Sequence, residues 1–364
     1  MDIMLTKLSI KNFKRLQNVE IELGQSVVFI GPNNSGKTTA LQALMLWASA
    51  LQHWQLVNLK GPFPPTNDPV RVIDVGDRGV TINRFDLFTM PVPQADLLWN
   101  ATKTQNRILE VGLEGITKNK KWECRFKFSY GNEESLYALP QNNDGKFSIA
   151  TGALDKQIAF LPSMSGLIAT EPKVEKGRVN VLIGEGRTAE VLRNLCYQLY
   201  DDQTHWQTLV DHMRQMFTIE LLPPEYLVAR GEIRMAYKDE NGITLDLSSA
   251  GRGMLQMLLL LAYLYANPGT VLLLDEPDAH LEILRQREVY QLLTTLTREM
   301  DSQLIIATHS EVILNEAGDQ GIAIAFVGQP HRINNHNQRS HVVEALKNVG
   351  FEYYHLAEQT GLAL

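Results

Sequence analysis

The residues best suited to do chemistry form a glycine-rich stretch, Gly31-Pro32-Asn33-Asn34-Ser35-Gly36-Lys37-Thr38. Its spacing, G-x-x-x-x-G-K-[ST], is that of a phosphate-binding loop. The apolar residues 27–30 before it predict a buried strand, and residues 39–46 after it predict a helix. Glycines let successive backbone N–H groups turn toward a phosphate, and a helix N-terminus adds the positive end of its dipole. A turn that matches by chance is disfavoured, because two more nucleotide-site motifs follow in order.

This loop predicts ATP and Mg²⁺ as cofactors. Lys37 would reach the β- and γ-phosphates, and the Thr38 hydroxyl would bind Mg²⁺. The residues predicted to bind the nucleotide are Gly31, Asn33, Asn34, Ser35, Gly36, Lys37, Thr38 and Thr39.

Two carboxylates, Asp275 and Glu276, directly follow the apolar residues 271–274. In this architecture a carboxylate at the carboxyl end of a strand lies beside the phosphate loop. Asp275 would then hold Mg²⁺, and Glu276 would position and polarise the attacking water. The alternative is a helix N-cap near Pro277, which remains open for Asp278.

A histidine, His309, follows the next apolar strand within the run Ala307-Thr308-His309-Ser310. A lone histidine is normally structural or exposed. Its position one strand after the Asp-Glu pair favours a catalytic role, in which it reaches the γ-phosphate and reports its presence.

A run of small residues, 248–253, opens the apolar helix that follows it. Small residues at a helix N-terminus expose backbone N–H groups and can bind an anion. Ser249 and Gly251 are therefore candidate nucleotide contacts, although any serine-rich N-cap has the same pattern.

Composition limits the function classes. The length of 364 residues allows two domains or one large α/β unit with insertions, and the net charge of −7 does not favour nucleic acid. The most apolar stretch, residues 254–266, falls short of the ~20 residues of a membrane span. It predicts a buried helix. Two cysteines, Cys124 and Cys196, suggest neither a disulfide framework nor a zinc site, and residues 1–7 lack a signal pattern, so we expect a cytoplasmic protein.

The pattern of apolar runs predicts the fold class. Runs at 271–274, 304–307 and 322–327 predict buried strands, and residues 281–300 predict an amphipathic helix. Near-continuous apolar strands that alternate with helices indicate an α/β fold with a mixed or parallel central sheet covered on both faces. We expect an N-terminal lobe at 1–154 with an antiparallel β subdomain, a helical insertion at 155–230, and a C-terminal lobe at 231–364.

Turn signals predict hairpins. Residues 107–115 and 122–130 flank the polar turn 117–121, and residues 232–237 and 243–247 flank Asn241-Gly242. A further turn is expected at residues 143–145. Lys118, Lys120 and Lys121 make the first turn basic, and a solvated tip is favoured there over a DNA contact.

Together, the four motifs resemble those of the ABC-type ATPase heads of SMC, RecF and OLD (overcoming lysogenization defect) proteins. The opening residues 8–14, Leu-Ser-Ile-Lys-Asn-Phe-Lys, look like the I-x-N-F start of that group. Residues 275–281, Asp-Glu-Pro-Asp-Ala-His-Leu, resemble most the OLD-type and related AAA family ATPases. The resemblance covers the whole chain and implies an ABC-type head.

The resemblance also implies residue roles and a homodimer or higher homo-oligomer of heads. Ser249 and Gly251 of one head would contact the γ-phosphate bound by Lys37 of the other. His309 would be the switch histidine, and Asp278 and His280 would lie at the interface. Ala250 and Arg252 depart from the usual signature, which has a second Gly and then Glu or Gln. Gln157 is a candidate for the glutamine loop of the family.

Two absences bear on function. No long coiled coil interrupts the chain, which argues against SMC-type tethering. The OLD-type nucleases continue into a Toprim nuclease domain, and residues 351–361 resemble the approach to it before the sequence ends at Leu364. The nuclease would be on another polypeptide, lost, or removed from this chain.

These observations favour a Mg²⁺-dependent ATPase that acts as a switch or sensor subunit of an OLD-like bacterial anti-phage defence or DNA-processing complex. Its expected partners are a separate nuclease or other effector, and double-stranded DNA is a further candidate. One alternative is a RecF-like DNA clamp in repair. A less favoured one is the nucleotide-binding subunit of an ABC transporter, since a transporter head would normally carry a fuller Leu-Ser-Gly-Gly-Gln signature and lack the Ile-Lys-Asn-Phe start. No membrane partner is expected.

Overall fold

The computed structural model describes residues 3–58, 72–74, 79–105, 107–141, 148–154, 157–164, 166–334, 339–340, 342–344 and 346. The chain divides into two compact units. Unit 1 comprises Met1–Leu87, Pro91–Ile158 and Gln303–Leu364, and unit 2 comprises Phe88–Met90 and Ala159–Ser302. This division differs from the three segments expected from the sequence, because the chain after Ser302 returns to unit 1. The turn expected at 143–145 and the Toprim-like residues 351–361 lie outside the described residues.

An antiparallel sheet forms much of unit 1, with the strand order β2-β1-β6-β7-β8-β5. The strands are β1 (Ile3–Phe13), β2 (Leu16–Glu22), β5 (Val80–Asn83), β6 (Leu109–Thr117), β7 (Lys120–Asn132) and β8 (Ser135–Pro140). The predicted hairpin at 107–130 is confirmed as β6 and β7. Its two turn residues, Lys118 and Asn119, have φ values of 47° and 63°. Such positive values at both turn positions match the right-handed twist of paired strands.

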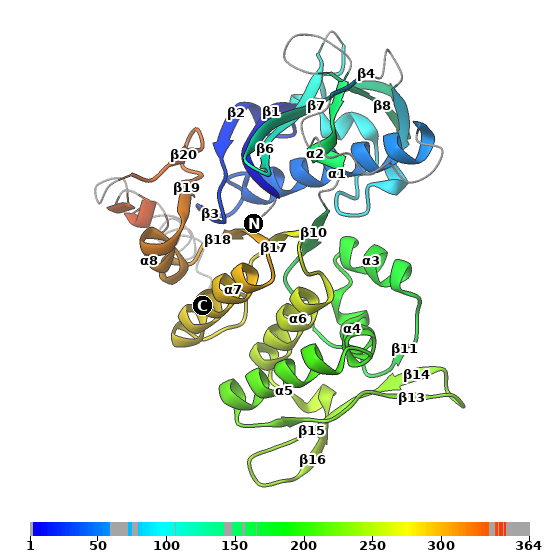
Figure 1. Cartoon of the computed structure of the whole chain (residues 1–364), viewed down its shortest axis with the longest axis vertical. Helices are drawn as coiled ribbons and strands as arrows, with labels where there is room; N and C mark the ends of the chain where they lie inside the picture. Colours follow the sequence, from blue (N-terminus) through cyan, green and yellow to red (C-terminus); the bar gives the residue numbers. More distant parts are fainter. Residues whose placement is uncertain are drawn as a thin grey trace, which may run out of the picture. The chain divides into compact units, whose positions relative to one another are not determined.

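A set of parallel strands forms the second layer of unit 1. Strand β3 (Ser26–Ile30) is paired on one side with β18 (Gln303–Thr308) and on the other with β19 (Ile322–Ala325), both parallel. All residues of β3 and β18 are buried, as the continuous apolar runs predict. A short β20 (His331–Arg332) pairs with β19. This sheet therefore brings together segments nearly 300 positions apart in the sequence (Figure 1).

Helices cover these strands. Helix α1 (Lys37–Asn58) packs against the antiparallel strands and against β18, and α8 (Glu311–Gln320) packs on β3 and β19 (Figure 1). Strand β4 (Val72–Asp74) pairs with β9 (Ser148–Ala150), which leads into α2 (Thr151–Leu154). Residues 84–102 contain three short 3-10 turns: η1 (Arg84–Asp86), η2 (Ala95–Leu98) and η3 (Asn100–Thr102). Two prolines, Pro91 and Pro93, interrupt any strand there.

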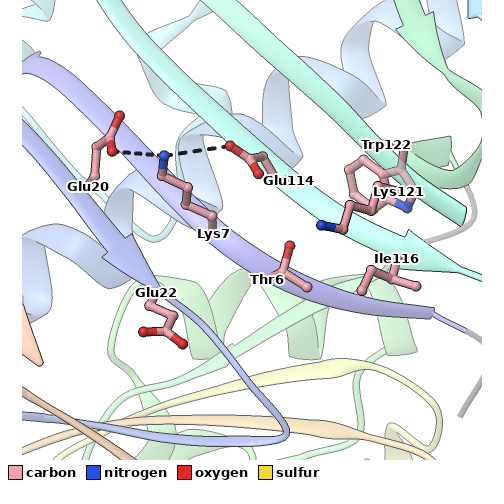
Figure 2. A pocket seen from close by; sticks show the side chains of 9 residues that line it. Thr6, Lys7, Glu20, Glu22, Glu114, Ile116, Lys121 and Trp122 are labelled. Carbon is pink, nitrogen blue, oxygen red and sulfur yellow. Dashed lines mark ion pairs between the residues drawn. The ribbon is translucent and has the colours of Figure 1, made fainter. Parts of the chain in front are cut away.

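The antiparallel sheet carries a shallow depression of about 520 Å³ that is lined from β1, β2, β6 and β7 (Figure 2). Lys7 lies at its centre, with its Nζ 2.8 Å from Glu20 Oε2 and 3.7 Å from Glu114 Oε1. The hydrogen bond to Glu20 raises the pKa of Lys7. The depression contains no residue of the phosphate loop.

Unit 2 is mainly helical. Its helices are α3 (Lys176–Gly184), α4 (Leu192–Tyr200), α5 (Gln203–Phe217), α6 (Arg252–Ala266) and α7 (Ile283–Glu299), with η4 (Thr188–Glu190) and η5 (Leu247–Ser249) between them. Helices α4, α5 and α6 pack on one another. Residues 254–265 of α6 are all buried, which confirms the predicted buried helix. Among the described residues, no helix is long and apolar enough to span a membrane.

Most strands of unit 2 form two three-stranded sheets. Strand β17 (Val271–Asp275) lies next to β10 (Ile158–Leu161). One three-stranded sheet has the order β11 (Glu171–Pro172), β14 (Glu232–Arg234), β13 (Glu225–Leu227), and the other has the order β12 (Glu220–Leu221), β15 (Ala236–Lys238), β16 (Thr244–Asp246). The hairpin predicted around Asn241-Gly242 is confirmed as β15 and β16. Residues 232–237, expected as one strand, are divided at the buried Met235 between two sheets.

A buried amide joins the two layers of unit 1. The Gln303 side chain accepts a hydrogen bond from Leu5 N (2.9 Å) and donates to Leu5 O and Gly24 O (2.8 Å each). Its residue is fully buried. Gln303, the first residue of β18, thus provides hydrogen-bond partners for backbone groups of β1 and of the turn before β3.

We expect Gln303→Leu to lower the free energy of unfolding by about 3 kcal/mol, because it leaves buried backbone N–H and C=O groups without partners. The urea midpoint, followed by tryptophan fluorescence, measures the loss. The matched control is Gln17→Leu at an exposed position of β2, for which we expect a change within about 0.5 kcal/mol. Equal midpoints for the two variants would contradict the assignment.

Candidate nucleotide-binding site

The phosphate loop of unit 1 joins the buried strand β3 to helix α1, which begins at Lys37. Lys37 is only 5% exposed, and its Nζ donates to Gly31 O and Pro32 O at 2.8 Å each. The Lys37 ammonium is therefore hydrogen-bonded to the backbone of its own phosphate loop. Thr38 is exposed at the start of the helix, where its hydroxyl can reach a ligand.

Close packing requires the two glycines of the loop. A Cβ on Gly31 would lie 2.9 Å from the backbone oxygen of Phe326 and 3.0 Å from its Cβ. Gly36 has a φ of +109°, a conformation that L side chains rarely adopt, and Asn34 also has a positive φ of 58°. Such a backbone conformation can turn N–H groups toward a bound anion.

A phosphate fits the residues of this loop. The Ser35 hydroxyl is buried and has no hydrogen-bond partner among the described residues. A buried donor without a partner is costly, so a ligand oxygen at this position would stabilise it. Of the other predicted contacts, Asn33 is exposed and Thr39 is half-buried in the first turn of α1.

The turn between β1 and β2 also reaches the loop, which the sequence analysis missed. The side-chain carbon Cδ of Arg15 lies 3.2 Å from the position of a Cβ on Gly36. The neighbouring Lys14 donates from Nζ to Gln42 Oε1 of α1 (2.7 Å), and burial lowers the pKa of Lys14 to about 8. In the sequence, the adjacent basic residues Lys14 and Arg15 at the end of the opening motif could have indicated this contact.

The register of the parallel strands places His309 beside the phosphate loop. Thr308, the last residue of β18, is paired with Ile30, the last residue of β3. His309 and Gly31 therefore leave neighbouring strands at the same edge, where ligands of open α/β sheets bind. His309 is exposed, and Ser310 caps α8 by accepting from Ile313 N at 3.3 Å.

The two acidic residues belong to unit 2. Asp275 ends β17 after four buried residues, and both Asp275 and Glu276 are half-buried. Glu276 has a φ of 50°, an uncommon left-handed value for a glutamate. Helix α7 begins at Ile283 with Glu282 as its N-cap, so the N-cap role left open for Asp278 is not observed. Asp278 is instead 4% exposed, and its backbone oxygen accepts from Leu281 N.

The signature-like residues also lie in unit 2. Ser249 ends η5 and is exposed, and Gly251 is the N-cap of α6. A Cβ on Gly253 would lie 3.3 Å from the backbone oxygen of His280, so the start of α6 touches the segment after the Asp-Glu pair. Two of the predicted interface motifs are thus brought together.

A second residue missed from the sequence, Gln256, holds this arrangement. It is fully buried in α6, its Oε1 accepts from Met164 N (2.9 Å), and its Nε2 donates to Pro277 O (3.4 Å). A lone amide within an apolar helix was the signal for it. Gln157, the candidate loop glutamine, is exposed directly before β10.

The predicted site is therefore divided between the two units. Unit 1 contains the phosphate loop and His309, and unit 2 contains Asp275, Glu276, Ser249 and Gly251. Among the described residues, no three His, Cys, Asp or Glu side chains form a metal site. Thr38 of unit 1 and Asp275 of unit 2 each carry one oxygen of the kind that binds Mg²⁺, an ion usually held together with phosphate oxygens and water.

Comparisons with known proteins identify the class. One family model, described as "AAA ATPase domain", matches residues 4–148. Another, described as "AAA domain, putative AbiEii toxin, Type IV TA system", matches residues 170–315. The fold resembles the Smc head domain with an extended coiled coil from Pyrococcus furiosus, solved bound to the C-terminal domain of ScpA. The TM-score is 0.52 at 13% identity, over 95% of this chain and 99% of that one.

Two curated relatives match over short segments. An OLD nuclease of Thermus scotoductus is 44% identical over 43 residues, which is 12% of this chain and 8% of that protein. The zinc import ATP-binding protein ZnuC of Rickettsia bellii is 27% identical over 113 residues, which is 30% of this chain and 47% of that protein. The matched segments thus span less than half of either relative.

The two family matches show ATPase domains in this chain, and its α/β fold is that of an ABC-type ATPase head.

We expect Lys37→Ala to weaken ATP binding at least 100-fold, because it removes the charge that faces the phosphates, while the melting temperature changes by only a few degrees. Calorimetric titration with ATP and Mg²⁺ measures the affinity, and circular dichroism checks the fold. Lys11→Ala, an exposed lysine of β1, is the control and should bind ATP normally. ATP affinity retained by the Lys37 variant would refute the assignment of this loop.

Proposed function

We propose that this ATPase head is the ATP-gated switch or sensor subunit of an OLD-like bacterial anti-phage defence or DNA-processing complex. In this proposal two heads dimerise on ATP, and the dimer controls a nuclease or other effector. The observation that carries the proposal is the division of the motifs. One compact unit contains the phosphate loop, and the other contains both the hydrolytic carboxylates and the signature-like loop.

Hydrolysis would proceed with residues of one chain. The backbone of residues 31–36 and Lys37 would bind the β- and γ-phosphates, and Glu276 would orient a water for attack on the γ-phosphorus. His309, at the end of β18, would contact the γ-phosphate from the neighbouring strand. Mg²⁺, bound through Thr38 and Asp275, would neutralise charge on the phosphates.

Dimerisation would complete the site. Ser249 and Gly251 are exposed on unit 2, where they can donate to the γ-phosphate on a second head. The segment from Asp278 to Glu282, which touches the start of α6, leads into two exposed apolar residues, Ile283 and Leu284 (70% and 78% exposed). Apolar side chains this exposed at the edge of an interface motif fit a surface that a second copy covers.

We expect Glu276→Gln protein to form a stable dimer with ATP and Mg²⁺, since it binds nucleotide but does not hydrolyse it. Adding Ile283→Ser and Leu284→Ser should return it to the monomer. Light scattering after size-exclusion chromatography gives the mass. The control adds Leu56→Ser and Val57→Ser, an equally exposed apolar pair at the end of α1 (74% and 69%), and should still dimerise. A Glu276→Gln protein that stays monomeric at saturating ATP would overturn the dimer mechanism.

The role within a complex requires its own test. We expect a pulldown of Glu276→Gln protein from its native host, with ATP and Mg²⁺, to recover a stoichiometric nuclease or effector identified by mass spectrometry. The Lys37→Ala protein is the control, which should recover less because it cannot dimerise on ATP. Recovery of DNA and repair proteins alone would contradict the switch role and favour a RecF-like clamp. Recovery of a membrane permease would instead favour a transporter subunit.

A further inference from the structure

Unit 2 contains a cavity that no nucleotide motif lines. Its volume is about 530 Å³, and it lies between the β13–β14 hairpin, the start of α4 and the end of β16. Three arginines line it, Arg193, Arg230 and Arg234, together with Glu232 and Asp246. The volume is within the usual range of small-ligand pockets.

Arg193 is built into the wall of this cavity. Its side chain is only 2% exposed, and its Nη1 donates to Ile168 O at 2.9 Å. The fully buried Glu171 fixes the position by accepting from the backbone N–H of Arg193 (2.9 Å) and of Asn194 (2.6 Å), which caps α4. The guanidinium also forms longer ion pairs with Glu171 (3.8 Å) and Asp246 (3.6 Å), so of its five N–H donors only one is in a hydrogen bond within the described residues. A ligand in the cavity could therefore accept from the Arg193 guanidinium in competition with Asp246.

The other two arginines add positive charge. Arg230 pairs with Glu232 (3.3 Å) at the surface. Arg234 is exposed, and no hydrogen bond or ion pair of its guanidinium to the described residues is present, although its charge contributes to lowering the pKa of Asp246. Arg193 is also 3.8 Å from Oε2 of the buried Glu171, so the positive charge open to a ligand comes mainly from Arg234. A guanidinium fork matches the oxygens of a phosphate.

One wall of the cavity supports the signature-like loop. Arg193 Nη2 lies 3.6 Å from Asp246 Oδ1. The same oxygen accepts from the backbone N–H of Ser248 (2.9 Å) and from its hydroxyl (2.7 Å), which caps η5. A ligand that binds Arg193 would compete with Asp246 and so loosen the cap directly before Ser249.

We propose that this cavity binds a phosphate-bearing ligand of about mononucleotide size, and that its occupancy is transmitted to the signature-like loop through Asp246. The ligand must compete with Asp246 and Glu232 for the arginines. A phosphate monoester with a charge of about −1.5 to −2 at pH 7 and three acceptor oxygens does so better than a carboxylate. The transmission step rests on the proposed function of Ser249 and Gly251, whereas the binding step does not.

The depression on the antiparallel sheet is a weaker candidate. Its central Lys7 is already paired with two glutamates (Figure 2), and the lining has three glutamates for two lysines. No buried charged group points to a ligand there.

Binding is tested in Lys37→Ala protein, so that the phosphate loop does not compete. The probes are pyrophosphate, AMP, and a 5′-phosphorylated dinucleotide, titrated by calorimetry. We expect at least one probe to bind, and Arg234→Ala to weaken it tenfold or more. Arg214→Ala, an exposed arginine on α5 outside the cavity, should have no effect. Tighter binding of AMP indicates a free nucleotide, and tighter binding of the dinucleotide indicates a nucleic-acid end.

Two results would overturn the binding site: no heat from any probe at millimolar concentration, or binding that Arg234→Ala leaves unchanged. The second result would place the bound probe outside the cavity and overturn the cavity site alone. The ATP titration of the Lys37→Ala protein tests the phosphate loop separately, so the two failures remain distinguishable.

Transmission is tested by hydrogen exchange of the peptide that covers residues 246–253, again in Lys37→Ala protein. We expect a saturating probe to speed exchange of the Ser248 amide several-fold, because its acceptor Asp246 is released from Arg193. Asp246→Asn, which weakens both contacts, should show fast exchange without ligand. A probe that binds while leaving this exchange unchanged refutes transmission.

Discussion

The parallel register of three strands is the constraint on which unit 1 depends. Strands β18 and β19 both pair with β3, and their last residues, Thr308 and Ala325, are both paired with Ile30. Three chain segments therefore end at one edge of the sheet, and the phosphate loop leaves from the middle one. The fit is close, since Phe326 N donates to Ile30 O at 2.7 Å and the backbone of Phe326 leaves room only for glycine at position 31. Any slip in register would move His309 away from the loop and fill the space that Gly31 requires.

Much of this arrangement could be predicted from the sequence. Continuous apolar runs gave the buried strands β3, β17 and β18, since a strand buried on both faces has no polar side to show. The hairpin at 109–132 followed from its turn, and helix α6 from its apolar length. These features depend on local pattern alone. The return of residues 303–334 to unit 1 does not, because strand order is decided by pairing between distant segments.

The parts that escaped prediction are side chains whose partners lie far along the chain. Gln303, Gln256 and Glu171 are fully buried polar residues, and each satisfies backbone groups of another element. Local signals existed for some of them, such as the lone amide of Gln256 in an apolar helix, but no local pattern says which distant backbone groups a side chain satisfies. Lys14 and Arg15 were missed for the same reason, since their approach to the phosphate loop depends on how the β1–β2 turn packs against α1.

The two anion-binding features of this chain recognise phosphate by different physical means. The phosphate loop uses backbone N–H groups and a helix N-terminus, which are fixed by the fold and cannot be withdrawn, so it suits a ligand bound in every cycle. The cavity of unit 2 uses guanidinium groups already engaged with carboxylates, so a ligand must displace Asp246 to gain the full interaction with Arg193. Such competition weakens ligand binding. It also couples binding to the hydrogen bonds that Asp246 accepts from Ser248, directly before Ser249. A site built in this way responds to ligand by changing a contact elsewhere, and that property separates a regulatory site from a catalytic one.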